Sequence, residues 1–274
     1  MAGIARVAPA GNDRLMLDSA HIALGAASGS VVGFVLGLIG GGGSILAVPL
    51  MVYVVGVASP HVAIGTSALA VAANAGCNLV THARAGTVKW RCAAIYAAAG
   101  VVGALGGSTL GKRIDGHALL ALFALVMVVV GVLMLRGRGD VGQAGAQCNR
   151  DNAPKVVGYG LGTGIVSGFF GIGGGFLIVP GLIASTGMPI LNAIGSSLVA
   201  VTAFGVTTAF NYALSGWVDW SLAAVFVGGG VIGGLLGVRA AAHLSGTTGM
   251  LRTVFAVLIF AVAAYILWRS ATGT

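Results

Sequence analysis

Uncharged apolar stretches of about twenty residues make up most of this chain, and a helix of that length crosses the hydrocarbon core of a bilayer. The 14 Lys and Arg residues and the 6 Asp and Glu residues fall in a few clusters between those stretches. Charged residues amount to 7% of the 274 residues, against about 25% in a soluble domain. The pattern predicts an all-α integral membrane protein with little mass outside the bilayer.

A glycine-rich block occurs twice in the chain. Its first copy spans residues 37–49 and its second spans residues 168–180, and in both the glycines, a valine and a final proline recur at the same spacing. Two further motifs return in the same order, from residues 63–67 and 86–90 to residues 193–197 and 216–220. We therefore expect two homologous halves.

The duplication divides the chain into four parts. We expect a polar N-terminal lead at residues 1–19, a first transmembrane repeat at 20–136, a linker at 137–155 and a second transmembrane repeat at 156–270. Each repeat should begin with a helical unit that its glycines break, either a hairpin or an interrupted helix, and should continue with three transmembrane helices.

Two topologies are open for this arrangement. If each broken unit is a re-entrant hairpin, each half crosses the membrane three times and the halves are inverted. If it is one interrupted crossing, each half crosses four times and the halves are parallel. The distribution of basic residues does not separate the two. We favour inverted repeats, because broken helices in transporters usually meet across a site near the middle of the membrane.

Half of the basic residues lie in two clusters that share one face of the membrane in either topology. They are Arg84, Lys89, Arg91, Arg136, Arg138, Arg150 and Lys155. Because loops on the cytoplasmic side are rich in Lys and Arg, we expect this face to be cytoplasmic, and we do not interpret the net charge of +8 as a nucleic-acid surface. The three cysteines, Cys77, Cys92 and Cys148, have neither the pattern of a disulfide framework nor that of a metal site.

Glycines are used in two ways in the first segment. Gly25, Gly29, Gly33, Gly37 and Gly41 recur at every fourth residue, which places them on one helix face and predicts close packing against another helix. The consecutive glycines that follow should instead stop the helix, since glycine weakens a helix and lets the backbone approach a ligand.

The two glycine breaks are the first candidate binding site. A helix start carries unsatisfied N–H groups and a partial positive charge, which attract anions. Irregular backbone deep in a membrane is tolerated only where it is buried in protein or lines a watery cavity. We favour a substrate site here over packing alone. The candidate residues are Gly40, Gly41, Gly42, Gly43 and Ser44 in the first break and Gly171, Gly173, Gly174 and Gly175 in the second.

Polar side chains in the next segment of each half are the second set of candidates. They are Thr66, Ser67, Asn74, Cys77 and Asn78 in the first half and Ser196, Ser197 and Asn211 in the second. Asn74, Cys77 and Asn78 share one helix face, which should point away from lipid. Such residues also bond to neighbouring helices, so a purely structural role is the alternative to substrate binding.

Charged groups that would indicate other functions are missing from the apolar segments. The chain has no glutamate, and all six aspartates fall at loops or segment ends, which argues against a buried carboxylate as a proton or sodium site. We expect no catalytic group, no metal site and no cofactor. The expected partners are a small anionic substrate and the lipid bilayer, with no nucleic acid, and association into a homodimer is left open.

Three motifs together resemble one known family. They are the doubled Gly-x-x-Gly-x-Gly-Gly-x-x-x-x-Val-Pro block, the Ala-x-Gly-[Thr/Ser]-Ser motif and the Gly-x-Val-x-Trp motif. They resemble the TauE/SafE family of sulfite and organosulfonate exporters over about residues 20–270. The resemblance implies a multi-pass inner-membrane permease of about eight segments, with its signature on the two breaks and on Thr66, Ser67, Ser196 and Ser197. Ser44 departs from the repeat, where the second copy has Gly175.

These observations predict a secondary transporter of small sulfur-containing anions, such as sulfite or an organosulfonate. Export is what the family resemblance implies, and alternating access around the two breaks is the expected mechanism. A passive anion channel or pore of the same architecture is the alternative.

Overall fold

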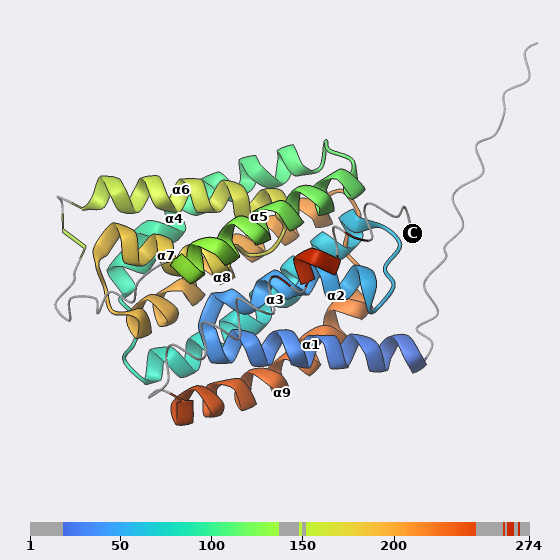
Figure 1. Ribbon diagram of the computed structural model, residues 1–274, viewed down its shortest axis with the longest axis horizontal. Coiled ribbons are helices and arrows are strands. Elements are labelled where there is room, and N and C mark those ends of the chain that lie inside the picture. The colour runs from blue at the N-terminus through green and yellow to red at the C-terminus, as the bar shows by residue number, and fades with distance from the viewer. Residues whose placement is uncertain are drawn as a thin grey trace, which may run out of the picture.

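Figure 1 shows the computed structural model of the protein, which describes residues 19–136, 148–149, 152–244, 260, 262–265 and 268. In chain order its helices are α1 (Ser19–Ile39), the 3₁₀ helix η1 (Gly40–Leu46), α2 (Ala47–Tyr53), α3 (Pro60–Arg84), α4 (Trp90–Gly111), α5 (Gly116–Arg136), α6 (Ala153–Phe170), α7 (Gly175–Thr186), α8 (Ile190–Ala213) and α9 (Trp220–Leu244). No strand occurs in this part of the chain.

Five of these helices, α1, α3, α4, α8 and α9, are long and apolar enough to cross a membrane. The prediction of an all-helical chain with several membrane spans is therefore confirmed. The predicted N-terminal lead, most of the predicted linker and most of the last predicted transmembrane helix lie outside the described residues. Within the predicted linker, α6 already begins at Ala153.

The glycine ladders bring two pairs of helices into backbone contact. Along α1, Gly29 and Gly33 lie directly against the backbone of Phe226 and Gly230 in α9. Along α4, Gly107 lies against the backbone of Ile165 in α6 in the same way. Residue numbers rise together in both pairs, so α1 runs parallel to α9 and α4 parallel to α6 (Figure 1). A Cβ atom would collide at each position, and the packing role predicted for the ladder is confirmed.

The chain turns back at each glycine block. After α6, Gly174 lies against Ser167 and Gly181 lies near Thr163, so α7 returns along α6. After α1, Gly43 lies against the backbone of Leu36, so η1 folds back on the last turn of α1.

The two reversals are built differently. At the second, Gly171, Gly173 and Gly174 adopt φ of 67°, 66° and 64°, in the left-handed region that favours glycine. At the first, the chain tightens from α-helix into η1 instead.

Helices α3 and α8 form the centre of the molecule and run antiparallel. Gly205 of α8 packs on Ala68 and Ala72 of α3, and a methyl group on Gly76 of α3 would lie 3.9 Å from Thr202 Cγ2 of α8. Both turns of the chain lie beside this pair, because η1 contacts α7 and α8 as well as α1. Small residues at the crossing let the two helices approach closely.

One sequence expectation was wrong. Cys92, in the first turn of α4, forms a disulfide with Cys148, shortly before α6 begins, with a Cα–Cα distance of 5.4 Å. Their sequence separation of 56 hides this pairing from the sequence, because the parallel packing of α4 on α6 is what brings the two helix starts together. Cys77 is free and exposed.

Candidate functional site

The second break is enclosed by protein. Residues 171–175 are all buried. A methyl group on Gly173 would lie 3.1 Å from Val71 Cγ1 of α3 and 3.3 Å from Val201 Cγ1 of α8, and Gly171 lies against Ile64. The irregular backbone is therefore buried between the two central helices, α3 and α8, and is not a surface loop.

The start of α7 offers backbone donors at this point. Gly174 is the residue before the helix, and no side chain caps it. Leu177 N and Ile178 N donate to Gly174 O, at 2.9 and 3.1 Å, and Ile172 N donates to Ser167 O at 3.3 Å. No acceptor for Gly173 N or Gly174 N appears among the described residues. Uncapped N–H groups at a helix start, together with the helix dipole, favour an anion.

Ser167 points its hydroxyl at the same place. Its side chain is fully buried, its Oγ has no hydrogen-bond partner among the described residues, and a methyl group on Gly174 would lie 2.8 Å from that oxygen. Sequence reasoning missed this residue. The sequence did contain a clue to Ser167, because a hydroxyl stands one turn before the second break where the first copy of the block has Leu36.

The first break provides a weaker helix start. Helix α2 has only seven residues and no side-chain cap, and η1 continues α1 without a left-handed turn at its described positions. Ser44 is fully buried within η1. The glycines at 40–43 therefore lie in a 3₁₀ helix that contacts α7, and the two breaks are neighbours but not equivalents.

Thr66 and Ser196 have partners away from the breaks. Asp219 N, just before α9, donates to Thr66 Oγ1 at 3.0 Å. Lys89 N, just before α4, donates to Ser196 Oγ at 2.9 Å. Each hydroxyl thus fastens the start of a helix from the other half. The structure gives both residues a positioning role, and substrate binding by them stays a prediction.

Ser67 and Ser197 make local hydrogen bonds. Ser67 Oγ donates to Ile64 O at 3.0 Å, and Ser197 Oγ donates to Ile194 O at 2.7 Å. Both side chains are fully buried in the central helices. Ser67 lies near the second break, since its partner Ile64 contacts Gly171.

The predicted polar face of α3 divides into two parts. Asn74 is 1% exposed and lies against Gly230 of α9, and neither Nδ2 nor Oδ1 has a hydrogen-bond partner among the described residues. Asn78 is also buried and lies against Gly234, one turn further along α9. Cys77, in contrast, is exposed and is not brought together with the two amides.

Asn211 lies in a different cluster, at the far ends of α4 and α8. Lys112 Nζ donates to Asn211 Oδ1 at 2.8 Å and to Ser215 Oγ at 3.0 Å. Asn211 Nδ2 donates to Ser108 Oγ at 2.6 Å and to Thr109 Oγ1 at 3.1 Å. These bonds satisfy the amide, so the cluster joins the two helices without needing a ligand.

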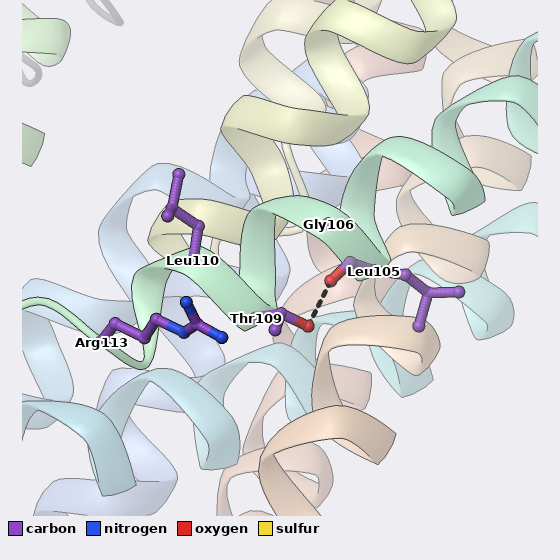
Figure 2. A pocket seen from close by; sticks show the side chains of 5 residues that line it. All are labelled: Leu105, Gly106, Thr109, Leu110 and Arg113. Atoms are coloured by element: carbon purple, nitrogen blue, oxygen red, sulfur yellow. Dashed lines mark hydrogen bonds between the residues drawn. The ribbon is translucent and has the colours of Figure 1, made fainter.

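A shallow hollow of about 430 Å³ lies beside that cluster, on the outer face of α4 (Figure 2). It is lined by Leu105, Gly106, Thr109, Leu110 and Arg113. Leu105 and Leu110 are exposed, and Gly106 faces open space. The hollow therefore opens away from the breaks, and it is not the site that the breaks form.

Two further buried hydroxyls have no partner among the described residues. Thr208 Oγ1 and Tyr212 Oη both lie on α8 and are fully buried. Together with Ser167 and Asn74 they are polar atoms that the described protein leaves unsatisfied, which is uncommon in a folded interior.

Known proteins were compared with this chain. The family model for the sulfite exporter TauE/SafE matches residues 25–266. This protein belongs to the TauE/SafE family. It is 53% identical over 249 residues to a probable membrane transporter protein of Xylella fastidiosa strain 9a5c, covering 89% of this chain and 94% of that protein.

More distant relatives of this TauE/SafE chain have similar names. The probable membrane transporter protein YunE of Bacillus subtilis is 28% identical, over 76% of this chain and 84% of its own length. The probable membrane transporter protein MJ0441 of Methanocaldococcus jannaschii is 25% identical, over 64% and 68%. No solved structure matches the chain. The TauE/SafE family is one of membrane transporters, not of enzymes, and the resemblance expected from the three motifs is confirmed.

Proposed function

We propose that this TauE/SafE protein is a secondary transporter that exports a small sulfur-containing anion, such as sulfite or an organosulfonate. The observation that carries the proposal is the buried, uncapped start of α7 with the unpartnered hydroxyl of Ser167 beside it. A buried hydroxyl without a partner costs about 1–3 kcal/mol, which a bound ligand would offset. A sulfite or sulfonate group presents oxygens that accept hydrogen bonds from such donors.

Other candidate ligands lie around the same turn. Gly173, Gly174 and Gly175 would donate through the backbone, and the glycines of η1 would approach the anion from the first half. Asn74 lies against Gly230 of α9, one turn along α3 from the Val71 that contacts Gly173, and would add an amide without a described partner. None of these groups is a carboxylate, which suits an anionic substrate.

We further propose inverted repeats in a multi-pass inner-membrane protein. The return of α7 along α6 and of η1 along α1 supports two re-entrant hairpins in place of two interrupted crossings. Three crossings per half then invert one half relative to the other, and the binding site is exposed alternately to the two faces. The face with the basic clusters is cytoplasmic in this proposal.

A flux assay in proteoliposomes with labelled sulfite tests the function. We expect flux above that of empty vesicles, saturating with sulfite, because a carrier binds its substrate in each cycle. Flux that rises linearly with concentration would favour the alternative, a passive anion channel. No flux with sulfite, thiosulfate or sulfoacetate would contradict transport of sulfur anions.

The Ser167→Ala variant tests the site. We expect a lower rate and a higher KM for sulfite, by about tenfold if one hydrogen bond to a charged ligand of about 1.5 kcal/mol is lost. Ser185→Ala in α7 is the matched control, because its buried Oγ already donates to Leu182 O at 3.2 Å. Equal flux in the two variants would place the anion elsewhere.

A further inference from the structure

We propose that the bodies which move against each other during transport are not the two sequence halves, because each half has exchanged one helix with the other. The α9 body consists of α1, η1, α2 and α3 from the first half and α9 from the second. The α4 body consists of α6, α7 and α8 from the second half and α4 from the first. This inference rests on the proposed alternating access, and it assigns the parts that would carry it out.

The first hairpin is clamped to α9. Gly29, Gly33 and Gly37 lie on the α9 backbone, and from the other side Gly229, Gly233 and Gly237 lie on the backbone of α1. Ser30 Oγ adds a hydrogen bond to Gly229 O at 3.0 Å. Interlocked backbones cannot slide along each other without collisions, so α1 and α9 move as one unit.

The second hairpin is clamped to α4 in the same manner. Gly164 and Gly168 lie on the backbone of Gly100 and Ala104, and Gly103 and Gly107 lie on the backbone of α6. Tyr96 Oη and Thr163 Oγ1 share a hydrogen bond of 2.8 Å between the two helices. The Cys92–Cys148 disulfide closes the same pair covalently near the helix starts.

Each exchanged helix is also fastened to the central helix of its new body. Thr66 of α3 accepts from Asp219 N at the start of α9, and Ser196 of α8 accepts from Lys89 N at the start of α4. At its other end α4 is joined to α8 through Lys112, Asn211 and Ser108. Hydrogen bonds therefore fasten α4 to α8 at both of its ends, and α9 to α3 at its start.

The contact between the bodies is of another kind. It includes α3 against α8, where Gly76 faces Thr202 and Gly205 faces Ala72, and Gly173 between Val71 and Val201. It also includes η1 against α7 and α8. The hydrogen bonds described between one helix and another, or the residues that flank it, lie inside a body. The loop between α3 and α4 is the exception, because Thr87 bonds to His82 of α3 and accepts from Asn192 of α8. An apolar contact between helices can shift at small cost, and the α3–α8 contact passes directly beside the second break.

Cross-linking distinguishes exchanged bodies from halves. The Gly25→Cys/Val225→Cys pair would join α1 to α9, since a methyl group on Gly25 would lie 3.4 Å from Val225 Cγ1. After oxidation, this pair and the Cys92–Cys148 disulfide together lock both pairs of helices that connect the halves. We expect sulfite flux to be unchanged after oxidation of this pair in a Cys77→Ser background. Loss of flux on oxidation, restored by reduction, would overturn the proposal.

The contrasting pair is Gly76→Cys/Thr202→Cys, which joins α3 to α8 across the two bodies. We expect its oxidation to reduce flux at least tenfold and reduction to restore it. The single-cysteine variants control for oxidation as such. Full flux through the oxidised pair would also overturn the proposal.

Distances between spin labels provide a readout that needs no transport. Leu110 of α4 and Val157 of α6 are exposed and belong to one body but to different halves, whereas Leu110 and Ile22 of α1 belong to one half but to different bodies. We expect one narrow distance for the first pair, and for the second a broad distribution that shifts with sulfite. The reverse result, or two narrow and unchanging distances, would overturn the proposal. If the parent protein does not transport sulfite, the proposed function fails. The widths of the two distance distributions then still test which helices move together.

Discussion

Ser167 and Asn74 are the residues whose surroundings point most directly to a missing ligand. Both are buried, and both carry polar atoms that no described group satisfies. They do not occupy matching positions in the two halves: by the repeated motifs, Asn74 corresponds to Phe204, whose ring packs on Gly100. A site built from them would have an amide from the first half and a hydroxyl from the second, although the helices around it are repeated in the two halves.

Replacing Asn74 by Leu should separate stability from activity. The apolar side chain has a similar volume and removes a buried amide without partners, so we expect the free energy of unfolding to rise by about 1–3 kcal/mol, seen as a higher Tm in detergent. If Asn74 binds the anion, sulfite flux falls in the same variant.

Asn211→Leu is the control for this change, because its amide is satisfied by Lys112, Ser108 and Thr109. We expect this variant to lose stability. A lower Tm for Asn74→Leu as well would show that its amide already has a partner in the membrane.

At the scale of the helix, glycine does three separate jobs that a composition cannot distinguish. It allows backbone contact along α1 and α4, it makes the left-handed turn before α7, and in some places it faces open space. Neighbouring glycines in one helix can differ in this respect. Gly106 has nothing near its Cβ position, whereas Gly107 lies on the backbone of Ile165.

The variants Gly106→Ala and Gly107→Ala should therefore change the stability of the protein in opposite directions. Alanine at 106 raises helix propensity by about 1 kcal/mol without a collision, so Tm should stay the same or rise. Alanine at 107 pushes α4 from α6 and should lower the free energy of unfolding by about 1–3 kcal/mol. Equal Tm values for the two variants would contradict the close contact.

The turn before α7 is tested by Gly173→Ala. Alanine at φ 66° is strained, and its methyl group would lie against Val71 and Val201, so we expect transport to be lost while the protein still inserts. Gly187→Ala is the control, because Gly187 has φ 70° at the end of α7 but faces open space. Full flux with Gly173→Ala would remove the second break from the mechanism. Full flux with both of the bulkier variants, Gly173→Leu and Gly42→Leu, would place the binding site away from the two breaks.

For the whole molecule, the Cys92–Cys148 disulfide and the basic clusters give opposite indications about orientation. The disulfide and four of the basic residues, Arg84, Lys89, Arg91 and Lys155, lie on the face where α3 ends and α4 and α6 begin. Clusters of Lys and Arg favour the cytoplasm, whereas structural disulfides are rare there. We give the charges priority, since they govern membrane insertion, whereas a disulfide only reports the redox state after folding.

The redox state in cells should follow from that orientation. We expect Cys92 and Cys148 to be thiols in growing cells and to pair on oxidation, because the cytosol keeps thiols reduced. Alkylation with a mass-tagged maleimide after rapid acid quenching should then modify all three cysteines. If only Cys77 is modified, the disulfide exists in the cell and the face lies on the oxidising side of the membrane.

Much of this protein was determined locally and could be read from its sequence. Apolar length dictates membrane helices, because a bilayer of fixed thickness must be crossed with every backbone group paired. The glycine ladder dictates close helix packing, and the doubled motifs identify the family and the two breaks.

Only the tertiary structure decided which helix each ladder contacts, that Thr66 and Ser196 fasten helices of the other half, and that Ser167 turns its hydroxyl toward Gly174. It also paired Cys92 with Cys148. Those outcomes depend on segments far apart in the chain being brought side by side, and helix periodicity describes the face of a segment without naming the partner that will cover it.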